Sequence, residues 1–93
     1  MTRRLTRIEI ATLLDLEEGF VLELERHEII MPGPDARFDA PSVERVRICW
    51  TMHDALDVNL AGLEVAMSLL ERWQDERRRV HTLIEELRRE RDE

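Results

Sequence analysis

The chain of 93 residues contains no lysine and no tyrosine, and it has a single cysteine. Because a disulfide needs two cysteines, Cys49 cannot form a bridge within the chain, and nothing indicates an oxidising compartment. No apolar run approaches the roughly 20 residues of a membrane span, and the first ten residues lack the apolar core of a signal peptide. These absences predict a cytoplasmic protein without a membrane segment.

Residues that perform catalysis or hold a metal ion are also scarce. Ser42 and Ser68 are the only serines, and no histidine or acid is spaced to activate either as a nucleophile. Cys49 and His53 lie four residues apart, but two ligands do not complete a zinc site. The three glycines are far apart, so no phosphate-binding loop is formed. We therefore expect an interaction module that is not an enzyme and uses no cofactor or metal.

Acidic residues outnumber basic residues, and most of this excess lies in one segment. The net charge is −7, and residues 15–28 contribute six acids and one arginine, a local balance of −5. Contacts to DNA phosphates need cations that replace condensed counterions, so this segment disfavours DNA and anionic membranes and favours a basic partner. Charge runs on helices are also commonly no more than solvated surface, and that alternative stays open.

Two short helices are predicted before residue 30. Thr6 and Glu9 form a capping box that begins the first near residue 7, with Ile8, Ala11 and Thr12 on its inner face. The second covers about residues 17–27, with apolar side chains inward and its acids in water. The inward residues are Phe20, Val21, Leu24 and Ile29; the candidate partner-binding acids are Glu17, Glu18, Glu23, Glu25 and Glu28.

Residues 31–35 must form a loop, because Pro32 and Pro34 lack amide donors and disfavour helix before them. Residues 36–38 could return as a hairpin two residues wide within this loop. Asp39 is then placed as the N-cap of a third helix over about 40–56, with Pro41 in its first turn. The predicted fold is all-α, a winged-helix-like head at 1–58 followed by a long helix at 59–93.

Asn59 is positioned to cap that last helix, which can run to about residue 91 without a proline. Its apolar residues follow the alternating three- and four-residue spacing of a coiled coil, interrupted only by Arg77. The half beyond Trp73 has no further segment of this chain to cover it, so we expect a homodimer whose orientation stays open. The predicted dimer seam is Leu70, Trp73, Val80, Ile84 and Leu87.

The order of helix, tight turn, helix, loop, helix and long helix resembles MerR-type regulators. The run 38–47, FDAPSVERVR, is similar to the third helix of that family. The positions at which the family carries arginine and tyrosine for DNA-backbone contacts fall on Gly19, Leu22 and Glu23 of this chain. The DNA-binding chemistry is therefore missing from the second helix.

A smaller branch, the chaperone modulator CbpM family, is more similar. Three parts of this chain resemble that family. They are the acidic second helix, the exit from it at 29–32 and, above all, the run 56–70, LDVNLAGLEVAMSLL. The resemblance implies a modulator that binds the J domain of a DnaJ-like or CbpA-like co-chaperone and blocks its docking to DnaK. The alternative is a MerR-type transcription regulator, for which residual DNA contacts would come from Arg3, Arg4, Arg7 and Arg37.

Overall fold

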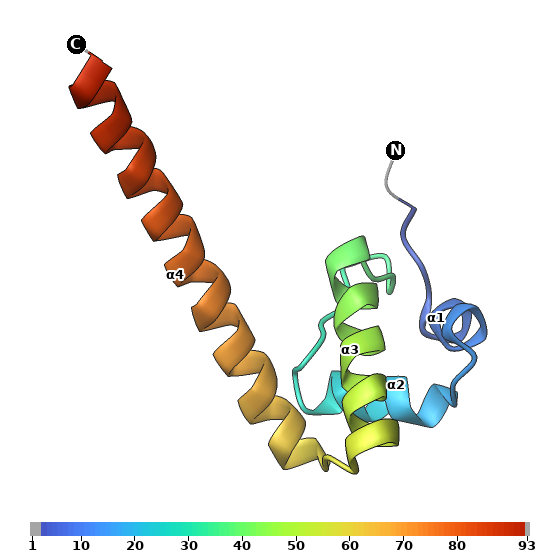
Figure 1. The fold of residues 1–93 in the computed structure, drawn as a ribbon. Helices are drawn as coiled ribbons and strands as arrows, with labels where there is room; N and C mark the ends of the chain where they lie inside the picture. The colour runs from blue at the N-terminus through green and yellow to red at the C-terminus, as the bar shows by residue number, and fades with distance from the viewer. Residues whose placement is uncertain (1–2, 93) are drawn as a thin grey trace.

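The computed structural model describes residues 3–92, which form four helices around one small core. The helices are α1 (Arg7–Leu14), α2 (Glu18–Arg26), α3 (Ala40–Leu56) and α4 (Leu60–Asp92), and Figure 1 shows their arrangement. Within the described residues there is no strand, only an isolated bridge between Leu5 and Phe38. The predicted all-α fold, a helix-turn-helix head followed by a long helix, is confirmed.

Side-chain caps set the helix boundaries where the sequence predicts them. The Glu9 amide donates to the Thr6 hydroxyl at 3.2 Å, and the Thr6 amide donates to the Glu9 carboxylate at 3.0 Å. Asp39 accepts a hydrogen bond from the amide three residues further on at 3.0 Å, and Asn59 does the same at 2.8 Å. Because these caps satisfy amides that have no partner inside the helix, they fix where α1, α3 and α4 begin.

The core is assembled from all four helices and the bridge. Its fully enclosed members are Ile10, Val21, Leu24, Phe38, Val46, Cys49 and Leu63. The inner face predicted for α1 is wrong in part, because Ile8 is 62% exposed and Thr12 is exposed, whereas Ile10 is 0% exposed. Apolar residues occur on both sides of this two-turn helix, so its sequence pattern cannot identify the face that α2 covers.

The chain segment after the loop pairs with a different partner from the one predicted. The Leu5 amide donates to the Phe38 carbonyl at 3.0 Å and the Phe38 amide donates to the Leu5 carbonyl at 2.7 Å. The extended segment therefore returns against the residues before α1. Within the loop the Gly33 amide donates to the Arg37 carbonyl at 2.9 Å, which closes a turn without forming paired strands. Since this pairing joins segments 33 residues apart, the local sequence pattern carries no signal for it.

The first turns of α4 belong to the head, and the rest of the helix leaves it. Leu63 and Met67 are buried in the common core, and His27 Nδ1 lies 2.7 Å from Glu64 Oε1. Beyond Leu70, every described residue of α4 is exposed, and Figure 1 shows this part projecting away from α1, α2 and α3. None of the described helices has both the length and the apolar character needed to cross a membrane.

Candidate partner-binding surfaces

The acidic face of α2 is partly neutralised by the chain itself. Arg7 Nε lies 3.0 Å from Glu18 Oε1, and Arg7 Nη1 lies 3.4 Å from Glu25 Oε2. The hydrogen bond to Glu18 raises the pKa of Arg7, so this cation stays charged between the two acids. Two of the predicted partner-binding acids therefore also hold α1 against α2.

Of the other three predicted acids, one pairs within α2 and two make no ion pair among the described residues. Glu23 pairs with Arg26 at 3.1 Å on the same exposed helix surface. Glu17, at the N-terminal cap position of α2, and Glu28, just after the helix, are exposed and make no ion pair within residues 3–92. The five acids consequently divide into Glu18 and Glu25, which pair with α1, Glu23, which pairs within α2, and Glu17 and Glu28, which stay unpaired among the described residues.

The arginines considered for DNA contacts are all held by acids of this chain. Arg4 Nε lies 2.9 Å from Asp35 Oδ2, and a second hydrogen bond from its Nη2 to Asp35 Oδ1 measures 3.2 Å. This bidentate pair lowers the pKa of Asp35 and ties the loop to the residues before α1. Arg3 and Arg37 each lie 3.4 Å from a carboxylate oxygen of Glu9.

The second helix has no cation at the three positions where a MerR-type regulator would contact the DNA backbone. Gly19 is exposed, and a Cβ atom placed there would have no atom within 4 Å. Leu22 is half-buried and Glu23 carries the wrong charge for phosphate. A phosphate approaching α2 would meet carboxylates, with Arg7 already shared between two of them.

The distal part of α4 carries an exposed apolar surface that differs from the predicted seam at one end. Leu70 is half-buried and packs against the core of the head, whereas Trp73, Val80, Ile84 and Leu87 are 43–56% exposed. Leu69 and Leu83, absent from the predicted seam, are similarly exposed and lie four residues before Trp73 and Leu87. We call Leu69, Trp73, Val80, Leu83, Ile84 and Leu87 the apolar stripe.

Arg77 lies within the apolar stripe and contacts one of its members, Trp73. Its guanidinium carbon lies 4.8 Å from the centre of the Trp73 ring, within the range of a cation–π contact. The guanidinium of Arg77 thus covers part of the exposed Trp73 ring. Its neighbours Arg78 and Arg79 pair with Asp75 at 2.7 Å and Glu76 at 3.0 Å on the same helix.

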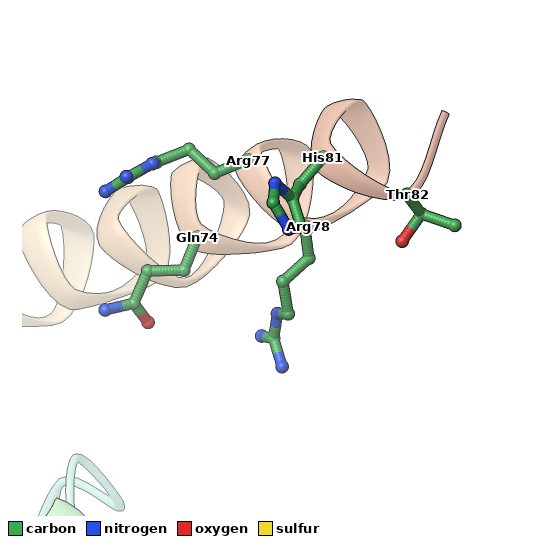
Figure 2. A pocket seen from close by; sticks show the side chains of 5 residues that line it. All are labelled: Gln74, Arg77, Arg78, His81 and Thr82. Atoms are coloured by element: carbon green, nitrogen blue, oxygen red, sulfur yellow. The ribbon is translucent and has the colours of Figure 1, made fainter. Parts of the chain in front are cut away.

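The surface hollows do not resemble an enclosed reaction site. Figure 2 shows the side chains of one of them, Gln74, Arg77, Arg78, His81 and Thr82, spreading from a single helix into open space. Cys49 lies in the core, where burial raises the pKa of its thiol to about 11. Within residues 3–92 no three histidine, cysteine or acidic side chains are grouped so that they could hold a metal ion.

The sequence comparisons agree with this geometry. The profile of MerR HTH family regulatory proteins matches residues 5–85, which cover both the head and most of α4. The chain belongs to the MerR HTH family. Neither the family description nor the names of the relatives below denote an enzyme.

Among curated relatives, the chain is similar to proteins called chaperone modulatory protein CbpM. Those from Coxiella burnetii strains Dugway 5J108-111 and RSA 331 / Henzerling II are each 24% identical over 79 residues, covering 81% of this chain and 74% of theirs. The predicted resemblance to the CbpM branch of the MerR HTH family is confirmed. No solved structure matches the chain significantly.

Proposed function

We propose that the chain is a non-enzymatic cytoplasmic inhibitor of a J-domain co-chaperone of the DnaJ or CbpA type. In this proposal its acidic α2 surface binds the basic helix of the J domain that would otherwise dock on DnaK. The observation that carries the proposal is the excess of acids on and around α2 in a chain similar to chaperone modulatory proteins. Opposite fields speed association of such a pair and disfavour acidic competitors.

The local geometry supports a protein partner over phosphate. Glu17 and Glu28 face solvent beside α2, while Arg4 and Arg37 are occupied by Asp35 and Glu9. A basic helix that approached this surface would compete with two arginines of the head, Arg7 at Glu18 and Glu25 and Arg26 at Glu23. DNA would have to approach the same carboxylates with a charge of the same sign.

Titration calorimetry with a purified J domain tests the proposal. Glu28 is the position of choice, because it is exposed and makes no ion pair among the described residues. Reversing its charge with Glu28→Lys should weaken binding about thirtyfold at low salt, since one charge contact at about 4 Å contributes on the order of 1 kcal/mol in water and its reversal doubles the change to about 2 kcal/mol. The difference should shrink as salt is added.

A matched control is available on α3. Asp54→Lys changes the net charge by the same amount at an exposed position outside α2, so it should leave the affinity within about twofold of wild type. Equal losses for Glu28→Lys and Asp54→Lys would mean that only net charge matters and would refute a site on α2. Reversal of Glu18 or Glu25 is a poorer test, because it would also break the Arg7 pairs between α1 and α2.

A MerR-type transcription regulator is the second candidate, and membership of the MerR HTH family favours it. Gel-shift measurements at low salt separate the two functions, because the phosphate contribution to binding is greatest there. The proposed inhibitor should not retard duplex DNA at micromolar concentration. Retardation that is lost in Arg4→Gln and Arg37→Gln would instead support the regulator.

A further inference from the structure

A small hollow adjoins α2 at the place where α1 and the loop come together. Its volume is about 240 Å³, and its described walls are Arg7 and Ile8 of α1, Glu25 of α2, and Pro32, Ala36 and Phe38 of the segment between α2 and α3. Most of these walls are apolar, and Glu25 is the only acid among the described residues that line the hollow. Pockets for whole small molecules are usually about 300–1,000 Å³, so this hollow suits a single side chain of a larger partner.

The Glu25 carboxylate has the weaker of the two contacts that Arg7 makes with α2. Arg7 Nε lies 3.0 Å from Glu18 Oε1, whereas Arg7 Nη1 lies 3.4 Å from Glu25 Oε2. The Glu25 side chain is also the less exposed of the two acids, at 29% against 46% for Glu18. Because solvent and salt screen a half-buried charge less, Glu25 can attract a second cation while Arg7 stays with Glu18.

The apolar walls of the hollow indicate what else the occupant must carry. Ile8 is 62% exposed although its side chain is large and aliphatic, and Ala36 is exposed as well. A long basic side chain covers such surface with its carbon stem while its charged end reaches a carboxylate. The N-terminus of α1 disfavours cations, so the charged end must lie against Glu25 of α2 and away from Thr6, the N-cap of α1. An acidic side chain would instead be repelled by Glu25.

We propose that the hollow takes one lysine or arginine side chain from the basic helix of the partner, with its carbon stem against Ile8 and its cation at Glu25. Arg7 then keeps its contact with Glu18 and yields Glu25 to the partner. In the free chain Arg7 is therefore an internal competitor for this subsite, and it lowers the affinity for basic surfaces. The inference rests on the proposed function, because that function supplies the basic helix.

Removing the competitor should strengthen binding, which structural damage alone would not do. In titration calorimetry with a purified J domain at low salt, Arg7→Gln should lower the dissociation constant about fivefold, the effect of one charge contact in water. Circular dichroism of the variant checks that the helices remain folded. Binding by folded Arg7→Gln that is unchanged or weaker would contradict the role of Arg7 as a competitor.

Combining Arg7→Gln with Glu25→Gln tests whether Glu25 is the carboxylate concerned. Glu25→Gln by itself should raise the dissociation constant about fivefold, and adding Arg7→Gln to it should lower the constant by less than about twofold. An equal gain from Arg7→Gln with and without the Glu25 charge would mean that only net charge matters and would refute the subsite. Neutralisation is used here because glutamine can still accept the hydrogen bond that Arg7 donates to Glu25.

Two residues of α1 with isomeric side chains test the apolar wall. Ile8→Ser should raise the dissociation constant at least fourfold, since each carbon group that the partner covers contributes about that factor. Leu13→Ser is the matched control, because Leu13 is 64% exposed on the same helix but does not line the hollow. It should bind within about twofold of wild type, and equal losses for the two variants would overturn the hollow as the site.

The wild-type titration separates this subsite from the proposed function. If the wild-type chain does not bind the J domain, the proposed function and the subsite are both overturned. If wild type binds, and Arg7→Gln, Glu25→Gln and Ile8→Ser all bind as it does, the proposed function stands and the subsite alone is wrong. Tighter binding by Arg7→Gln that depends on Glu25, together with weaker binding by Ile8→Ser, is the result expected.

Discussion

Replacing Leu63 by alanine should destabilise the whole head, although Leu63 belongs to the long C-terminal helix. Its side chain is 0% exposed and lies in the core that also contains Val46 of α3 and Leu24 of α2. The substitution removes three carbon groups worth about 0.8 kcal/mol each and leaves a cavity, so we expect a loss of about 3 kcal/mol in the free energy of unfolding.

That loss is large for a chain of this size. A 93-residue domain has a free energy of unfolding of roughly 5–14 kcal/mol, so Leu63→Ala removes a fifth or more of it. The melting temperature should fall by about 12 °C or more, since 1 kcal/mol corresponds to roughly 4–8 °C in a domain of this length. Urea unfolding followed by circular dichroism and by tryptophan fluorescence at a fixed protein concentration measures the change.

Val65→Ala provides the control, because Val65 is two residues away on the same helix and 60% exposed. It should change the free energy of unfolding by less than about 0.5 kcal/mol. The base of α4 is not part of the cooperative core if Leu63→Ala also changes the free energy of unfolding by less than about 0.5 kcal/mol. The same conclusion follows if circular dichroism and tryptophan fluorescence report separate transitions.

Three further predictions follow from particular residues. Asp39→Ala should lower the free energy of unfolding by about 1 kcal/mol by removing the cap of α3. The hydrogen bonds to Ser42 hold the pKa of Asp39 below its usual value, so this difference is full at neutral pH and should disappear as the pH falls through that pKa in acid titration. Ala36 has φ 58°, so urea unfolding should show Ala36→Gly more stable by about 0.5 kcal/mol and Ala36→Val less stable. Finally, Cys49 should not react with a thiol reagent at pH 8 until the chain unfolds, because its pKa is about 11.

The fold could be predicted largely from local signals. The capping residues Thr6, Asp39 and Asn59 each bind an amide three residues further on, so the helix starts follow from side-chain chemistry alone. The uncovered end of α4 was also predictable, since no apolar segment remained to pack on it. What the sequence could not supply was the face of α1, where apolar residues occur on both sides, and the distant pairing of Leu5 with Phe38.

The positions of the candidate surfaces were predictable from the sequence, but the contacts that their residues make within the chain were not. The acids of α2 are evident from composition, yet only the folded chain brings Arg7 between Glu18 and Glu25, which come eleven and eighteen residues later. Similarly, spacing alone placed Leu70 in the predicted seam and left out Leu69 and Leu83, whereas in the folded chain Leu70 packs against the head and Leu69 and Leu83 are exposed. Both differences arise because the tertiary arrangement determines which side chains have partners.

The most direct measurement of the central claim is the ATPase rate of DnaK stimulated by a J-domain co-chaperone, with the chain added at increasing concentration. An inhibitor that covers the DnaK-docking helix should lower the rate in a saturable manner to that of DnaK alone, without altering the unstimulated rate. Glu28→Lys should require a higher concentration for the same inhibition. A stimulated rate that stays constant while the folded chain is in excess would contradict the account.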